Sequence, residues 1–171
     1  VLAAIGVRAG DTVLVGGAGG GVGVFVVQLA VLAGARVIGT GSASSADFLR
    51  ELGAEPVTYG DGLVERVKAL APGGVTAAAD LVGVETAQAA IELGVPADRV
   101  ATIAAADPPA GVRRTGGVEA SPGALERVAE LVAAGRLTVP IAATYPLERV
   151  REAVERQRAG HVHGKLVVTL A

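Results

Sequence analysis

Residues 12–23 of this chain read TVLVGGAGGGVG, an apolar strand that runs into a glycine cluster, and the apolar stretch 24–33 follows at once. Glycines allow a tight turn whose backbone N–H groups can face anionic oxygens, and the N-terminus of a following helix favours negative charge. At the spacing of the dinucleotide fingerprint the glycine positions are Ala18, Gly20 and Gly23, an A-x-G-x-x-G variant. The stretch therefore predicts a phosphate-binding turn rather than a plain glycine-rich hairpin.

Composition limits what the chain can be. Its 171 residues suit one domain, spanning 1–171, with a sizeable core. The net charge of -2, with no basic stripe, argues against a nucleic-acid partner, and the absence of cysteine excludes a disulfide or a thiolate zinc site within the chain. The apolar run 22–33 is too short to span a bilayer and no signal peptide opens the chain, so we expect no membrane partner and a cytoplasmic location. Because Val1 lies in what reads as a helix end, we also expect a piece of a longer protein.

Strand and helix patterns alternate along the chain. Gly34 and Gly53 are good helix stops, and Ser121 followed by Pro122 is typical of a helix start. We expect strands at 12–15, 36–40, 56–59, 77–82, 99–105, 111–115 and 165–170, an extended segment at 137–142, and helices at 22–33, 45–52, 63–70, 85–93, 121–134 and 147–158. Such alternation requires parallel strands. The sequence predicts an α/β fold, a doubly wound parallel sheet (the Rossmann fold) in three layers, α/β/α.

The ligand of such a fold lies across the carboxyl ends of the strands, where the strand order reverses. We therefore expect three groups of cofactor-binding residues: Ala18, Gly19, Gly20, Gly21, Val22 and Gly23 at the pyrophosphate; Thr40, Gly41, Ser42, Ser44 and Ser45 at the adenosine ribose; and Val82, Gly83, Ile103 and Ala104 at the nicotinamide half. Lys165 either reaches the cofactor from the tail or is a plain strand-edge lysine.

The loop after the second strand bears on the choice between NAD and NADP. An Asp or Glu there would bind both ribose hydroxyls and repel a 2′-phosphate. Residues 39–45 read GTGSASS, with no acid and several hydroxyls, so we expect NADP (NADPH) rather than NAD. The loop also lacks Arg and Lys, and helix capping by Ser44 and Ser45 is an alternative role for their hydroxyls.

The glycine stretch, preceded by Gly10-Asp11, resembles the cofactor domain of the medium-chain dehydrogenases/reductases, and specifically their zinc-independent NADPH:quinone oxidoreductase branch. Further matching motifs follow in the same order along almost the whole chain, at 34–40, 48–55, 80–83, 134–140 and 160–167. The resemblance implies hydride transfer from NADPH to a quinone or activated alkene, a small-molecule substrate, no metal in the site, and a homodimer whose sheets join edge to edge. It also implies a cofactor contact by Tyr59 near the 2′-phosphate, with core packing as the alternative role of that side chain.

The chain departs from that family in two respects. The base that many relatives carry after the second strand is replaced by Ser44, Ser45 and Ala46. The separate catalytic domain that opens family members is absent, so the catalytic residues are unknown and the substrate pocket lies mostly elsewhere. The tail 137–171 packs towards that domain in relatives, and we expect its apolar faces to be exposed or paired with a partner.

Other interpretations remain open at this stage. The chain is alternatively a stand-alone NAD(P)-binding module that senses redox state or serves a partner, and a different nucleotide such as S-adenosylmethionine is a third hypothesis. The glycines also fit the short-chain dehydrogenase pattern, but Tyr145 with Arg149 is a poor substitute for its Tyr-x-x-x-Lys pair. The pair His161 and His163 lacks an evident third metal ligand, and we expect a solvated loop there. For Asp80 we expect a buried, hydrogen-bonded structural role.

Overall fold

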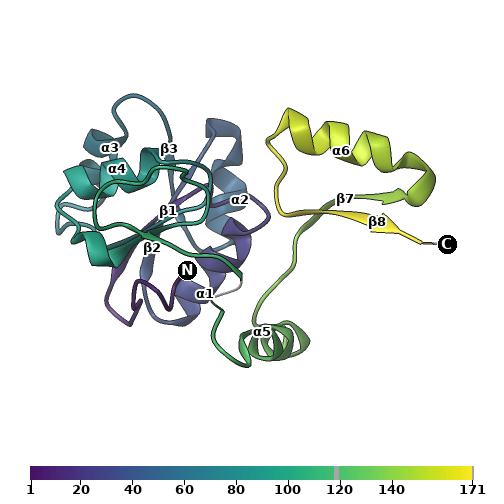
Figure 1. Ribbon diagram of the computed structural model, residues 1–171, viewed down its shortest axis with the longest axis horizontal. Coiled ribbons are helices and arrows are strands. Elements are labelled where there is room, and N and C mark those ends of the chain that lie inside the picture. Colours follow the sequence, from purple (N-terminus) through teal and green to yellow (C-terminus); the bar gives the residue numbers. More distant parts are fainter. Residues whose placement is uncertain (118–119, 171) are drawn as a thin grey trace.

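The computed structural model describes residues 1–117 and 120–170. Its main sheet has six parallel strands in the order β3-β2-β1-β4-β5-β6 (Figure 1). The strands are β1 (Thr12–Gly16), β2 (Arg36–Gly41), β3 (Glu55–Thr58), β4 (Ala77–Asp80), β5 (Val100–Thr102) and β6 (Arg113–Arg114). The strand order reverses between β1 and β4, which is where doubly wound sheets bind their ligands. The predicted fold class is confirmed.

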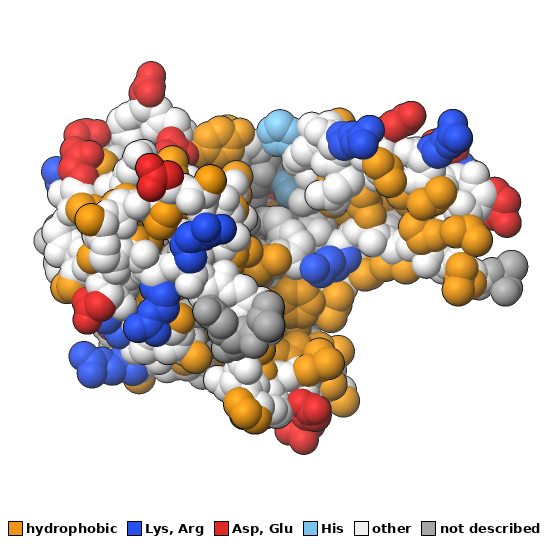
Figure 2. Space-filling view, in the orientation of Figure 1, with side chains coloured by type: hydrophobic (Ala, Val, Ile, Leu, Met, Phe, Trp, Pro, Cys, Tyr) orange, Lys and Arg blue, Asp and Glu red, His pale blue; other side chains and the backbone are white. Residues whose placement is uncertain are grey.

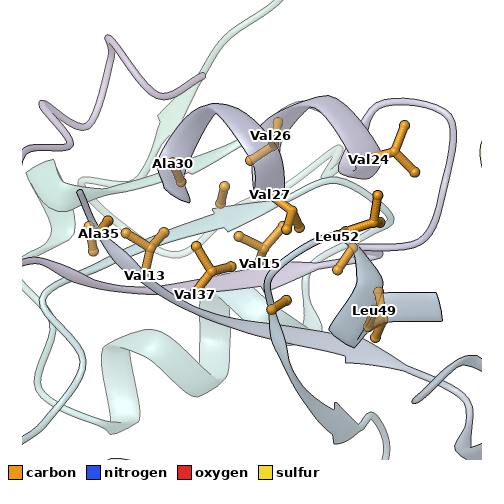
Figure 3. Packing of buried hydrophobic residues seen from close by; sticks show 14 of the residues in the cluster. Val13, Val15, Val24, Val26, Val27, Ala30, Ala35, Val37, Leu49 and Leu52 are labelled. Atoms are coloured by element: carbon orange, nitrogen blue, oxygen red, sulfur yellow. The ribbon is translucent and has the colours of Figure 1, made fainter. Parts of the chain in front are cut away.

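Helices cover both faces of this sheet. On one face, α1 (Gly23–Leu32) and α2 (Ala46–Glu51) pack on β1 and β2, with Val13, Val15 and Val37 beneath Val27 and Ala30 (Figure 3). On the other face, α3 (Leu63–Leu70) and α4 (Glu85–Glu92) cover Leu14 and Ile38. The centre of the sheet is built of small side chains, since Ala77, Ala78 and Ala79 of β4 are fully buried. Small residues allow the helices to approach the strands closely.

Helix ends follow the sequence signals in part. Gly34 and Gly53 have positive φ values of 83° and 92° and stop α1 and α2, as expected. The expected start at Ser121 is wrong: α5 (Ala124–Ala133) begins after Gly123, whose φ of 73° is left-handed, and no side-chain cap bond is present. The fourth, fifth and sixth strands are shorter than expected. Strand β4 ends at Asp80, whose side chain accepts the N–H groups of the turn that follows, and the 3₁₀ turn η2 (Ala97–Arg99) replaces the start of the fifth strand. Strand β6 is limited to Arg113–Arg114.

The tail forms a unit of its own. Strands β7 (Ile141–Pro146) and β8 (Lys165–Thr169) pair in parallel as a separate two-stranded sheet, linked by η4 (Leu147–Arg149) and α6 (Val150–Ala159). This unit lies beside the main sheet and its helices rather than within them (Figure 1). The sequence predicts an extended segment at 137–142, but strand β7 starts at Ile141, so the predicted limits are wrong.

Hydrogen bonds from α1 and from the glycine loop hold the tail, and the tail unit exposes apolar side chains. The Gln28 side chain of α1 donates to the Thr138 carbonyl oxygen (3.0 Å) and accepts from the Thr138 N–H (2.8 Å). The Gly164 N–H donates to the Gly19 carbonyl oxygen (2.9 Å). The large apolar side chains left exposed on and around the unit are Val139, Ile141, Leu147, Val150, Val154, Val168 and Leu170. In the described parts of the chain, no helix has the length and apolar character needed to cross a membrane.

Candidate functional site

The glycine loop joins β1 to α1 at the point where the strand order reverses. Gly17, with a φ of 67°, starts the turn, and its N–H donates to the Thr40 hydroxyl (3.1 Å) at the end of β2. The Ala18 N–H donates to the Thr40 carbonyl oxygen (3.2 Å), so the turn is fixed to the neighbouring strand. Gly23, the last glycine of the fingerprint, has no room for a side chain: a Cβ would lie 2.2 Å from the Gly17 carbonyl oxygen. The loop is bare backbone held against a helix start, which is suited to a phosphate group.

The cavity beside this loop has a volume of about 580 Å³. It runs from the glycine loop past the ends of β2 and β4 to the tail, and its lining includes Thr40, Ser45 and Lys165. The first turn of α1 carries no acidic residue, so nothing there opposes an anion. A volume of this size is in the range of ordinary ligand pockets.

The turn between β4 and α4 is organised by Asp80, as predicted. The side chain is 1% exposed and accepts hydrogen bonds from the N–H groups of Val82 (3.1 Å), Gly83 (2.9 Å) and Ala87 (3.1 Å). The buried Thr102 hydroxyl at the end of β5 donates to the Gly83 carbonyl oxygen (3.3 Å). These bonds fix the backbone on one side of the cavity, and the structural role expected for Asp80 is confirmed.

The serine loop between β2 and α2 forms a chain of hydroxyls. The Ser42 hydroxyl lies 2.9 Å from that of Ser44 and 2.7 Å from that of Ser45. Neither η1 (Ala43–Ser45) nor α2 has a side-chain cap bond, so the alternative of helix capping by Ser44 and Ser45 is not observed. The hydroxyls are instead directed at one another and at the tail.

The tail completes the wall opposite the serine loop. His163 stacks on Phe48 of α2 with ring centroids 4.6 Å apart and planes 7° apart. Its Nε2 atom lies 2.9 Å from the Ser45 hydroxyl, 118 positions away in sequence. Lys165, the first residue of β8, places its Nζ atom 5.5 Å from the ring centroid of Phe25, on the glycine-loop side. Figure 2 shows the chain's two histidines at the junction of the main body and the tail unit.

The cavity brings together most of the residues expected to bind the cofactor. It is lined by Gly19, Gly20, Gly21, Val22, Gly23, Thr40, Gly41, Ser42, Ser45, Tyr59, Val82, Gly83 and Lys165. Tyr59 is 50% exposed, so core packing, its alternative role, is wrong. Ala18 is fully buried, because its methyl group points at Gly39 of β2: a Cβ on Gly39 would lie 2.8 Å from it.

Three other expected residues lie outside this lining. Ser44 is exposed and reaches the cavity only through Ser42. Ile103 lines a second, larger hollow between the N-terminal segment, α1 and α5, and Ala104 is exposed on the same loop after β5. Ile103 and Ala104 lie outside the lining because β5 ends at Thr102 and the chain turns away from the carboxyl edge of the sheet directly after it.

Sequence reasoning expected Lys165 from the tail but missed other residues of the lining. His163, Gln157 and His161 line the cavity, and Glu85 at the start of α4 accepts from the Gly60 N–H (2.7 Å). Their sequence positions gave no signal, because the contacts join elements far apart in the chain. Within residues 1–117 and 120–170, no three His, Cys, Asp or Glu side chains are grouped to hold a metal ion.

The cavity fits a dinucleotide. The bare backbone of the glycine loop and the N-terminus of α1 suit the pyrophosphate, and Gly21 leaves room for Lys165, whose Nζ atom would lie 3.2 Å from a Cβ there. The Thr40, Ser42 and Ser45 hydroxyls offer polar partners at the adjoining end of β2. The residues present therefore agree with a bound dinucleotide cofactor.

Comparison with curated proteins gives relatives about twice as long. The chain is 30% identical to the acryloyl-coenzyme A reductase of Sulfurisphaera tokodaii, over 95% of this chain and 52% of that protein. It is 32% identical to the human mitochondrial NAD(P)H oxidoreductase RTN4IP1, over 94% of this chain and 48% of the relative. The chain thus spans about half the length of these relatives.

Solved structures of similar fold and a family profile also match this chain. The quinone oxidoreductase from Coxiella burnetii superposes with a TM-score of 0.78 at 26% identity, covering 99% of this chain and 56% of the other. The mycobacterial protein Rv1454c, complexed with NADPH, superposes with a TM-score of 0.74 at 26% identity, covering 95% of this chain and 57% of the other. The profile of the family described as zinc-binding dehydrogenase matches residues 52–168. The chain therefore belongs to the zinc-binding dehydrogenase family and is an oxidoreductase cofactor-binding domain of the medium-chain dehydrogenase/reductase superfamily.

Proposed function

We propose that this chain binds NADPH and positions it for hydride transfer to a quinone or an activated alkene in a longer protein. The observation that carries the proposal is the cavity of about 580 Å³, in which the glycine loop and an acid-free serine loop lie side by side. The relatives support the same chemistry: one is an acryloyl-coenzyme A reductase and one structural neighbour is a quinone oxidoreductase. Another neighbour was solved with NADPH.

The protein groups bind and orient the cofactor. The backbone of residues 19–22 and the start of α1 would hold the pyrophosphate, and the hydroxyls of Thr40, Ser42 and Ser45 would face the adenosine ribose. Asp80 and Thr102 keep the turns beside the nicotinamide half rigid through their backbone hydrogen bonds. When bound, the dihydronicotinamide supplies the hydride, so these residues need no nucleophile or base of their own.

The loop after β2 supports the proposed preference for NADPH over NADH. Residues 39–45 carry no carboxylate that would repel a 2′-phosphate. The carboxylates that line the cavity, Asp80 and Glu85, both accept backbone N–H groups. We assign the chain to the zinc-independent quinone oxidoreductase branch on the motif resemblance given above. Metal analysis of a protein extended upstream of Val1 tests that assignment, and bound zinc would contradict it.

Hydride transfer is tested by extending the reading frame upstream of Val1. If a catalytic domain precedes Val1, the extended protein should oxidise NADPH with a quinone or an enone, followed by the loss of nicotinamide absorbance. The 171-residue chain alone should bind NADPH with little turnover, because it spans about half the length of the relatives that carry out such reactions. Quinone reduction by the isolated chain at an ordinary enzyme rate would contradict the proposal. A native start close to Val1 would favour a stand-alone module that serves a partner.

A further inference from the structure

The serine loop lacks the cation that a 2′-phosphate needs. Its hydroxyls, on Ser42, Ser44 and Ser45, can donate hydrogen bonds, but residues 39–46 contain no Arg or Lys. The nearest basic residue along the chain, Arg50, is more than half exposed and paired with Asp47 (2.7 Å). A phosphate held by hydroxyls alone would leave most of its charge unbalanced, so a further donor has to come from elsewhere in the fold.

The tail brings an imidazole to this loop. His163 Nε2 is 2.9 Å from the Ser45 hydroxyl, and Ser45 is 6% exposed, so the contact lies at the inner end of the hydroxyl chain. Imidazole presents an N–H donor in its neutral form and a positive charge when protonated. His163 is the only residue of the described chain that connects the tail unit to the serine hydroxyls through a hydrogen bond.

The imidazole is held in place from two sides. Phe48 stacks flat on the ring, and the next residue, Gly164, donates its N–H to the Gly19 carbonyl oxygen (2.9 Å). Gly164 has a φ of 84°, and a Cβ there would lie 2.2 Å from the Pro140 carbonyl oxygen, so this close approach requires glycine. The tail backbone is thus attached directly to the glycine loop. A fixed donor loses little freedom when it binds a ligand.

Two positive or potentially positive groups are thereby divided between the two ends of the cavity. Lys165 lies on the glycine-loop side, beside Gly21, whereas His163 lies at the serine loop. The carboxylates of the lining, Asp80 and Glu85, are bonded to backbone N–H groups of other segments. The imidazole thus lies beside the serine loop, the part of the site at which we expect the adenosine ribose.

We infer that His163 selects NADP(H) over NAD(H) by donating a hydrogen bond to the 2′-phosphate, together with Ser42 and Ser45. The inference rests on the proposed function, because it needs a dinucleotide in the cavity. It assigns the phosphate-recognising base to the tail, 118 positions from the serine loop.

The test compares two small probes that differ only in the 2′-phosphate: adenosine 2′,5′-bisphosphate and adenosine 5′-monophosphate. Calorimetric titration of the 171-residue chain should give tighter binding of the bisphosphate. His163→Ala should weaken the bisphosphate by roughly ten-fold or more, the usual value of a hydrogen bond to a charged group, and leave the monophosphate unchanged. His163→Gln retains an N–H donor, so its affinity for the bisphosphate should lie between those of the unmodified chain and of His163→Ala. Arg158→Ala, which removes an exposed basic side chain of α6 outside the cavity lining, is the matched control and should behave as the unmodified chain.

The possible outcomes separate the inference from the proposed function. If the unmodified chain binds neither probe, the proposed cofactor site is wrong and the inference fails with it. If it binds both probes equally, the nucleotide site stands and selection of the 2′-phosphate is refuted. If His163→Ala weakens both probes by the same factor, or neither, the role assigned to His163 is refuted while the site remains. Circular dichroism confirms folding, and His163→Gln carries the test if the alanine variant does not fold.

Discussion

At the scale of single residues, Gly23 is a position where the fold leaves no room for a side chain. A methyl group there would lie 2.2 Å from the Gly17 carbonyl oxygen and 2.5 Å from that of Ala18, both backbone atoms of the phosphate-binding turn. Gly23→Ala should therefore push the turn away from α1 and cost about 1–3 kcal/mol of stability, the usual range for overpacking. Thermal unfolding and NADPH titration would measure the effect.

Gly73 provides the control for that substitution. It lies in the loop before β4, has no positive φ, and a Cβ there would meet nothing within 4 Å. Gly73→Ala should leave both the melting temperature and NADPH binding close to those of the unmodified chain. Equal losses for the two variants would contradict the account given of the glycine loop.

Asp11 makes a second prediction at this scale. Its side chain is 7% exposed, pairs with Arg99 (2.8 Å) and accepts from the Thr76 hydroxyl (2.7 Å). Burial raises the pKa of Asp11. The hydrogen bonds from Thr76, Arg99 and the Arg8 N–H, together with the Arg99 charge, lower it by more than burial raises it, so the pKa lies below its ordinary value of 3.8. A lowered pKa in the folded state stabilises the protein above the unfolded pKa, and this contribution is lost as the pH falls through the folded value.

Asp11→Asn should accordingly lower stability by roughly 1–3 kcal/mol at neutral pH, because it leaves the partly buried Arg99 without its counter-charge. The difference between variant and unmodified chain should begin to shrink below about pH 4, the ordinary pKa of an Asp in the unfolded chain, and should disappear as the pH falls through the lowered pKa of the folded state. Urea unfolding of both proteins at neutral pH and at low pH measures the difference in their free energies of unfolding. The exposed pair Arg36 and Glu55 is the comparison: Glu55→Gln should cost less than about 1 kcal/mol. A pH-independent loss for Asp11→Asn would argue against the ionic explanation.

Residues bound locally in sequence were predicted best. The fingerprint glycines and Asp80 were identified because their partners lie within a few positions, as in the bonds from Asp80 to Val82 and Gly83. His163 lies in a loop, as expected, but its side chain is half-buried rather than solvated, because it contacts Ser45 and Phe48, more than a hundred positions away. No local pattern reports such a contact.

At the scale of elements, apolar periodicity predicted the buried helices and strands of the main sheet. Helix α3 has the predicted limits, because its apolar positions Leu63, Val64 and Val67 are all buried. The helix start at Ser121 failed, since Gly123 takes a left-handed conformation that a serine cap signal does not reveal. Strand β7 starts only at Ile141, directly after Pro140, which has no N–H to donate to a strand ladder.

The tether between α1 and the tail unit gives a prediction at the element scale. Gln28 exchanges hydrogen bonds with Thr138 through both its amide nitrogen and its amide oxygen. Gln28→Ala should loosen the tail without unfolding the main sheet, so amide exchange should quicken in residues 137–170 while the strands of the main sheet stay protected. Gln88→Ala, an exposed glutamine on α4, is the matched control. Uniform loss of protection across the chain would refute a local tether.

At the scale of the whole molecule, the chain consists of a doubly wound sheet and an adjoining tail unit. The exposed apolar side chains of that unit, Ile141 and Leu170 among them, agree with the expectation that its faces are left open. Whether a catalytic domain covers them remains a prediction, as do the division into domains, the homodimer and the cytoplasmic location. The parallel arrangement of the main-sheet strands follows from alternating helices and strands, whereas the separation of β7 and β8 into a second sheet depends on contacts that the pattern does not encode.

The central claim is that the acid-free serine loop and the tail together form an NADPH site. Calorimetric titration of the 171-residue chain with NADPH and with NADH tests it most directly. The account predicts that NADPH binds with the lower dissociation constant, by roughly ten-fold or more, since only NADPH carries the phosphate that these groups can bind. Equal affinity for the two cofactors, or tighter binding of NADH, would contradict it.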